Sequence, residues 1–184
     1  MHGLMQRLTA AGLAALVVAT LAPGLCAQDY LSDPSQFIYQ ANVTDFETFP
    51  DGNTVPYSTA TLDDEWSRVG FLISDNTAGD GAMAISNTTG SVFPHSGTRG
   101  LTDGPSNLGG FIRFDFVDQR TGAPAMVWEA GIWVQNGDAG STVAFFDAGG
   151  GELTSFTTSG LDEFVGLRYT EGIAAIEISD GAQY

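Results

Sequence analysis

The sequence has very few of the side chains that enzymes commonly use as nucleophiles, bases and metal ligands. Its 184 residues include one cysteine (Cys26), two histidines (His2 and His95) and no lysine. For the chain beyond residue 27, this excludes a zinc site of the usual type, a phosphate-binding loop and a Schiff base. The sequence has no Gly-x-Ser-x-Gly motif whose serine could pair with His95 as a nucleophile, so we interpret His95 as an ordinary loop residue.

Long apolar runs are also missing, except at the N-terminus. Residues 8–22 carry no charge and are almost all Leu, Ala and Val, and a Pro-Gly pair follows them. The small residue Ala27 then precedes a plausible cut before Gln28. This order is typical of a secretory signal peptide, and the run is shorter than the roughly 20 residues that a membrane span needs. We therefore predict that residues 1–27 are cleaved from a secreted protein whose mature form has no membrane span.

Positive charge is scarce as well. The chain carries 22 acidic residues against six basic ones, and all six are arginines. Because one arginine, Arg7, lies in the predicted signal peptide, the mature chain has a formal charge of 5 − 22 = −17. Such a surface repels phosphate backbones and anionic membranes, so we expect no nucleic-acid partner. The same charge attracts Ca²⁺.

The mature chain is rich in glycine and in short β-type runs, which are separated by Gly, Asn, Asp and Ser. After a lead-in segment at 28–41, this pattern predicts one antiparallel, jelly-roll-like β-sandwich domain over 42–184, without disulfides. Residues 93–110 are expected to form a long loop. The predicted strands are 42–48, 68–74, 82–87, 111–117, 126–135, 141–147, 153–158, 164–169 and 173–179.

Several motifs, taken in order, resemble a family of exported bacterial β-sandwich proteins. They are DFETFPDG (45–52), VGF (69–71), IRFDF (112–116), TVAFFDAGGGEL (142–153), FVGLRY (164–169) and GIAAIEIS (172–179). The family is that of surface or matrix proteins of the PEP-CTERM type, which is similar to jelly-roll carbohydrate-binding modules. Members continue past the last strand into an acidic pair, another strand and often a sorting tail, so we expect either a freely released protein or one lacking a final strand.

Alternation along the strands separates a core face from a polar face, since neighbouring side chains in a strand point to opposite sides. Trp128 is expected to share the core face with Ala130. If these strands pair as neighbours, Trp133 stands exposed on the polar face among charged side chains. Such an arrangement can hold a sugar. One alternative is that the charged side chains only form ion pairs between strands. The other is that a bulge at Gly131 turns Trp133 inward. The predicted ligand-binding residues are Trp133, Arg113, Asp115, Glu129 and Arg168.

The resemblance also implies a structural calcium ion near the first strand and the end of the chain. The matching residues are Glu47, Asp51 and Asp180, whose carboxylates are of the type that Ca²⁺ prefers. A second candidate loop contains Asp75 and Asp80. The alternative is that all of these are solvated surface acids.

Three functions remain open from the sequence. The first is a secreted, non-catalytic protein that binds carbohydrate or extracellular polymer and is stabilised by Ca²⁺. The second is a structural, self-associating surface protein. The third is a glycoside hydrolase that uses a loop acid pair, from Asp63-Asp64-Glu65 or Asp162-Glu163, and we rank it last because nothing in the sequence indicates a raised pKa for these acids.

Overall fold

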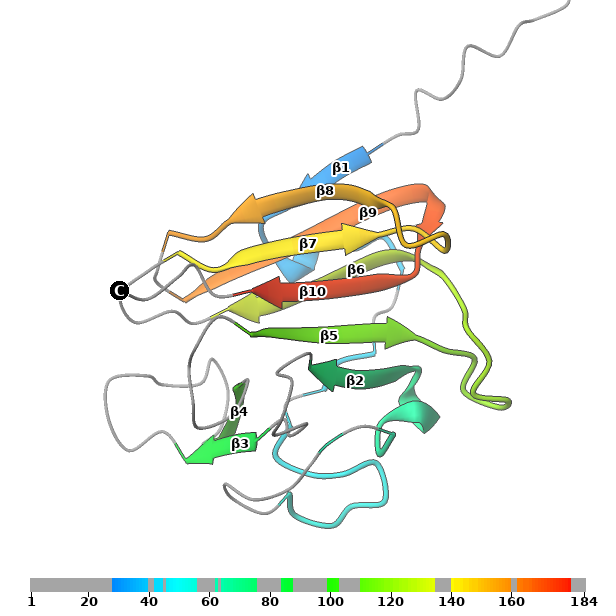
Figure 1. Ribbon diagram of the computed structural model, residues 1–184, viewed down its shortest axis with the longest axis vertical. Helices are drawn as coiled ribbons and strands as arrows, with labels where there is room; N and C mark the ends of the chain where they lie inside the picture. Colours follow the sequence, from blue (N-terminus) through cyan, green and yellow to red (C-terminus); the bar gives the residue numbers. More distant parts are fainter. Residues whose placement is uncertain are drawn as a thin grey trace, which may run out of the picture.

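Two antiparallel sheets pack face to face in the computed structural model, which describes residues 28–39, 42–44, 46–55, 62, 64–75, 84–87, 99–102, 110–134, 140–159 and 162–179. Figure 1 looks onto the larger sheet, with the smaller one behind it. The smaller sheet has the order β1 (Gln28–Leu31), β9 (Glu163–Ile173), β6 (Val127–Val134). The larger sheet has the order β2 (Phe71–Asp75), β5 (Phe111–Phe116), β10 (Ala175–Ser179), β7 (Thr142–Phe146), β8 (Glu152–Thr157).

Three small elements complete the described fold. β3 (Ala84–Asn87) and β4 (Arg99–Thr102) form a separate two-stranded hairpin. The two helices are single 3-10 turns, η1 (Pro34–Gln36) and η2 (Ser67–Val69). Neither turn is long or apolar enough to cross a membrane.

The predicted antiparallel β-sandwich is confirmed, whereas some of the strand assignments are wrong. Residues 42–48 form no strand in their described part, where Thr48 makes only an isolated bridge to Thr54. The physical reason lies at Phe46, whose φ of 59° is in the left-handed region and interrupts an extended chain. Two strands were not predicted: β1 lies within the expected lead-in segment, and β4 lies within the expected long loop.

The core fills the space between the two inner faces, which are the faces that the sheets turn toward each other. In the larger sheet, Ile176 of β10 lies opposite Phe114 of β5 and Phe145 of β7, and all three side chains are buried. Val165 and Leu167 of β9 are buried on the inner face of the smaller sheet. Burial of these apolar side chains is the main stabilising contribution, at about 1.5–3 kcal/mol for each large one.

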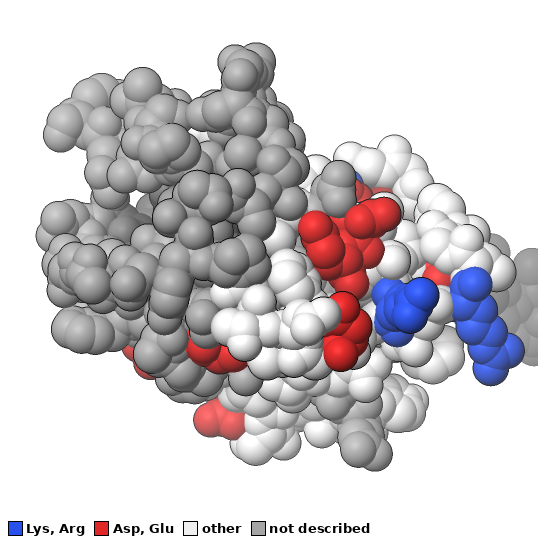
Figure 2. All heavy atoms as spheres, turned by 90° about the horizontal axis from the view of Figure 1, so that it is seen from below, with Lys and Arg blue, Asp and Glu red and all other residues white. Residues whose placement is uncertain are grey.

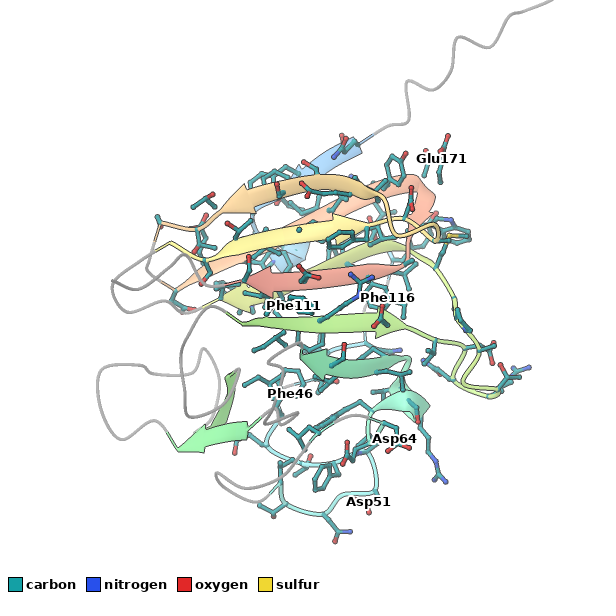
Figure 3. All side chains as sticks on the ribbon, viewed as in Figure 1. Phe46, Asp51, Asp64, Phe111, Phe116 and Glu171 are labelled. Carbon is teal, nitrogen blue, oxygen red and sulfur yellow. The ribbon has the colours of Figure 1, made fainter. Side chains whose placement is uncertain are left out.

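The larger sheet is wider than the smaller one, so part of its inner face needs another cover. Figure 1 shows β2 beyond the edge of the smaller sheet, with the described residues 46–55 and 64–69 beside it. Trp66 is 1% exposed there and lies against Phe46, with ring centroids 5.4 Å apart, and against Phe71, in a stacked arrangement at 6.4 Å. Phe46 also lies 6.3 Å from Phe114 of β5 (Figure 3). This aromatic cluster takes the place of a missing strand.

A bulge in β6 overturns one expectation about the core. The register of β6 with β9 shifts between Val127 and Glu129, so the alternation of side chains breaks at Trp128. Trp128 does not share the inner face with Ala130, as predicted, but is 61% exposed. Val127 packs against the core in its place.

We predict that Trp66→Ala lowers the free energy of unfolding by about 3–5 kcal/mol, because it empties a large buried volume. The matched variant Trp128→Ala changes it by no more than about 0.5 kcal/mol, since an exposed ring loses little packing. Urea denaturation followed by circular dichroism measures both values. An equally large loss in Trp128→Ala contradicts the exposed position of that ring.

Candidate functional site

Residues 32–39, which we call the strap, cross the outer face of the smaller sheet. The strap begins directly after β1 with a capped turn, in which the Gln36 side-chain oxygen accepts hydrogen bonds from the N–H groups of Ser32 (2.7 Å) and Asp33 (3.0 Å). Its Phe37 ring packs edge-on against Phe164 of β9, with ring centroids 5.8 Å apart. The turn therefore folds the chain back over the sheet that β1 has just joined.

One carboxylate and one guanidinium hold the strap in place. Glu129 of β6 has a side chain only 4% exposed, and it accepts hydrogen bonds from the N–H groups of Ile38 (3.0 Å) and Tyr39 (3.1 Å). Arg168 of β9 donates to Glu129 Oε1 at 2.6 Å. Its remaining nitrogens donate to Asp29 of β1 (3.0 Å) and to the Gln36 carbonyl (2.5 Å). We call this arrangement the Glu129–Arg168 clasp.

The clasp keeps Glu129 ionised despite its burial. Burial by itself raises the pKa of the Glu129 carboxyl, because it penalises the charged form. The N–H groups of Ile38 and Tyr39, followed by the hydrogen bond and positive charge of Arg168, outweigh burial and lower the pKa below the ordinary 4.5. The carboxylate therefore carries its charge at neutral pH, and its hydrogen bonds compensate for the lost hydration.

Trp133 lies on the same outer face, but it is not a freely exposed ring. It is half-buried, and its ring packs edge-on against Phe164 at a centroid distance of 5.5 Å. The bulge in β6 is at Val127–Glu129, so it does not turn Trp133 inward at Gly131. Gly131 has a different role: a Cβ atom there would lie 2.4 Å from the Phe164 ring, so the glycine leaves room for that ring over the sheet.

The expected single polar face is wrong, because its residues lie on two different sheets. Glu129, Trp133 and Arg168 are on the smaller sheet, whereas Arg113 and Asp115 are on β5 of the larger one. There Arg113 pairs with Asp115 at 2.9 Å and with Glu177 of β10 at 3.3 Å, and its guanidinium lies 4.7 Å from the centre of the Phe146 ring. The Arg113–Glu177 contact is an ion pair across strands, of the kind that the sequence left open as an alternative.

Beside the clasp, four side chains form an exposed apolar surface that we call the aromatic patch: Ile38, Tyr39, Met126 and Trp128. Tyr39 is 60% exposed, and its ring lies 6.0 Å from that of Trp128 at an angle of 46°. Sequence reasoning missed the patch because strict alternation placed Trp128 in the core. The only warning was the run Met126-Val127-Trp128, three apolar residues that a regular strand does not bury on one side.

The residues predicted to bind calcium are not brought together in the described part of the chain. Asp180 lies outside the described residues, and no group of three or more Asp, Glu, His or Cys in the described part is arranged to hold a metal ion. Glu47 is half-buried. The Asp51 carboxylate accepts hydrogen bonds from the backbone and side-chain N–H groups of Asn53, which lower its pKa, as does the charge of Arg68. The calcium site stays a prediction.

Of the acids considered for hydrolysis, Asp64, Glu65, Asp162 and Glu163 are described, and the contacts of Glu163 are local. Figure 2, which views the molecule from below, shows acidic side chains grouped beside basic ones on that face. Asp64 lies on the turn before η2 (Figure 3), while Asp63 is outside the described residues. Glu163 accepts hydrogen bonds from the N–H and hydroxyl groups of Ser159, both at 2.9 Å. These contacts stabilise a turn.

The fold and the aromatic patch together define a β-sandwich protein with an exposed aromatic surface. No protein-family model, no curated protein and no solved structure matches this chain. The resemblance to exported PEP-CTERM-type proteins therefore stays a prediction.

We predict that Gly131→Ala lowers the free energy of unfolding by about 1–3 kcal/mol, as overpacking does. The added Cβ would lie 2.4 Å from Phe164 Cζ and 2.9 Å from the Cα of Gly166, so both strands must shift. Gly149→Ala is the control, since it lies in an exposed turn and its Cβ would meet only Asp147 Oδ1, at 3.2 Å. Denaturant titration measures both, and an equal cost contradicts the close approach at Gly131.

The clasp also predicts an acid dependence of stability. Because the pKa of Glu129 is lower in the folded than in the unfolded protein, its contribution is fully present above the unfolded pKa and is lost as the pH falls through the folded pKa. We expect wild type to be more stable than Glu129→Gln at neutral pH, and this difference to shrink below about pH 4.5. Urea titrations between pH 7 and pH 3 measure it, and a difference that is constant over that range contradicts the assignment.

Proposed function

We propose that this protein is an exported, non-catalytic β-sandwich protein that holds an extracellular polysaccharide on its aromatic patch. The carrying observation is the exposed pair of Trp128 and Tyr39, whose rings lie 6.0 Å apart. Exposed aromatic rings stack against the apolar face of sugar rings, and contiguous exposed apolar surface commonly serves binding. The angle of 46° between the rings suits a polymer whose sugar units turn along the chain.

The net charge of the chain indicates which kind of polysaccharide fits the patch. A chain with a formal charge of −17 after the predicted cleavage repels anionic polymers such as uronates. Glu129, which follows Trp128 in β6, is turned away from solvent and paired with Arg168. A neutral polysaccharide therefore fits the patch better than an acidic one.

The proposal includes a jelly-roll-like topology for the sandwich, and the order of the strands supports it. Between β5 and β10 the chain passes repeatedly from one sheet to the other, and only β7 and β8 follow each other within a sheet. The order β5-β10-β7-β8 is that of one sheet of a jelly roll, with β2 added at its edge. Jelly-roll sheets are a frequent framework for lectins.

The test is retention on insoluble cellulose and chitin and mobility in gels containing neutral β-glucan, xylan or mannan. We expect wild type to bind at least one of them, and Trp128→Ala and Tyr39→Ala each to weaken binding about tenfold or more, a loss of the size expected for a stacked ring. Trp133→Phe is the matched aromatic control and is expected to bind like wild type. The assay is run with Ca²⁺ and with a chelator, because a structural calcium ion held by Glu47, Asp51 and Asp180 remains part of the proposal.

Two results contradict the proposal. Wild type that binds none of these polymers removes the function, and binding that survives Trp128→Ala but fails in Trp133→Phe moves the site to the Trp133 ring. Sedimentation of wild type and Trp128→Ala is measured in the same buffers. If wild type self-associates and the variant does not, the patch is an interface between copies of the chain.

A further inference from the structure

We infer that Glu129 and Arg168 are positioning residues for the aromatic patch, and that the Tyr39–Trp128 pair exists only while the strap is docked on them. The ligand-binding consequence rests on the proposed function, whereas the assembly of the pair does not. The two rings come from separate parts of the chain. Tyr39 is on the strap, and Trp128 is on the bulge of β6.

A single carboxylate connects these two parts. Glu129 directly follows Trp128 in β6, and it accepts the N–H of Tyr39 itself at 3.1 Å. The backbone of each ring is therefore tied to the same buried group. Arg168 fixes the other side of the strap, through the Gln36 carbonyl. Other described contacts of the strap, such as Phe37 on Phe164, lie before the ring pair in the chain.

The clasp requires a carboxylate and not only a side chain of that shape. Oε1 accepts from Arg168 and Ile38, and Oε2 accepts from Ile38 and Tyr39, so both oxygens face only donors. A glutamine has the same size but replaces one oxygen with an NH₂ group. In either orientation this group meets an N–H donor, from Arg168 or from Tyr39, and one contact is lost.

Holding the rings in advance strengthens binding, because the bound state then orders fewer groups. Tyr39 is 60% exposed on a segment outside the sheets, and such a ring samples many positions unless its backbone is held. The clasp provides this restraint through hydrogen bonds to the backbone, which leave the ring itself open to a ligand. A polysaccharide that stacks on both rings thus depends on residues that it does not touch.

The chain offers a matched ion pair for comparison. Arg113 and Glu177 on the larger sheet are of the same chemical kind, and the arginine side chains are similarly covered, at 23% exposed for Arg113 and 20% for Arg168. None of the described hydrogen bonds of Glu177 is to the strap. Glu177, at 20% exposed, is less buried than Glu129, and Glu177→Gln therefore measures what the loss of one part-buried, paired charge does to the sandwich in general.

The experiment has a ligand-free part and a binding part. In the free protein, nuclear Overhauser contacts between the Tyr39 and Trp128 rings and the amide resonances of Ile38 and Tyr39 are recorded for wild type, Glu129→Gln and Glu177→Gln. We expect Glu129→Gln to lose the ring contacts and to shift both amides, while Glu177→Gln keeps them. Retention on the polymer that wild type binds is expected to weaken about tenfold in Glu129→Gln only.

A second pair of variants decides the matter if Glu129→Gln fails to fold. Ile38→Pro removes one N–H donor but leaves Glu129, Arg168 and both rings in place, and Phe37 already has the extended conformation (φ −62°, ψ 132°) that a following proline requires. Ile38→Ala keeps the N–H and removes only the side chain. We expect the ring contacts to be lost in Ile38→Pro and to persist in Ile38→Ala, and polymer retention to be weaker in Ile38→Pro than in Ile38→Ala.

Ring contacts that persist in both Glu129→Gln and Ile38→Pro overturn the inference. It is also overturned if Glu177→Gln weakens retention as much as Glu129→Gln, because the effect then follows general stability. If wild type binds no polysaccharide, the proposed function fails, while the ring contacts of the free protein still decide whether the clasp positions the pair.

Discussion

The buried carboxylate of Glu129 is the constraint on which the smaller sheet depends. An ionised side chain that is 4% exposed is strongly destabilising unless its lost hydration is replaced by hydrogen bonds. Here the hydrogen bonds come from two separate parts of the chain, the strap and Arg168 of β9, and Arg168 in turn donates to Asp29 of β1. The charge therefore selects one arrangement of the N-terminal segment, because no other described donors satisfy it.

Apolar packing supports the same arrangement on the outer face of this sheet. The ring of Phe164 lies over the paired glycines Gly131 and Gly166, and Phe37 and Trp133 contact its edges. Aromatic rings placed over glycines restore packing that a sheet loses where side chains are missing. The smaller sheet thus has a covered outer face, whereas the outer face of the larger sheet carries the part-buried ion pairs of Arg113.

At the β2 edge, the inner face of the larger sheet is covered by irregular chain and not by a strand. Five strands facing three leave β2 and part of β5 without a strand opposite, and the side chains of Phe46, Phe49 and Trp66 pack there instead. Phe46 takes up a left-handed backbone conformation within this cluster, at a cost that the packing of its ring against Trp66 offsets. Irregular chain thus replaces regular structure where the sheets differ in width.

The sequence by itself determined the class of the fold, because glycine-rich turns and alternating apolar runs specify antiparallel strands locally, and Phe111–Phe116 follows that rule closely. It also singled out Glu129, Arg168, Arg113 and Asp115, either as ligand-binding residues or as members of ion pairs across strands. Only the tertiary structure decided which partners these are, since the division of strands between two sheets depends on contacts far apart in the chain. Long-range pairing of β6 with β9 likewise decided the bulge that exposes Trp128. The buried charge of Glu129 decided the position of the strap that brings Tyr39 to that ring. Neither cause leaves a local pattern in the sequence.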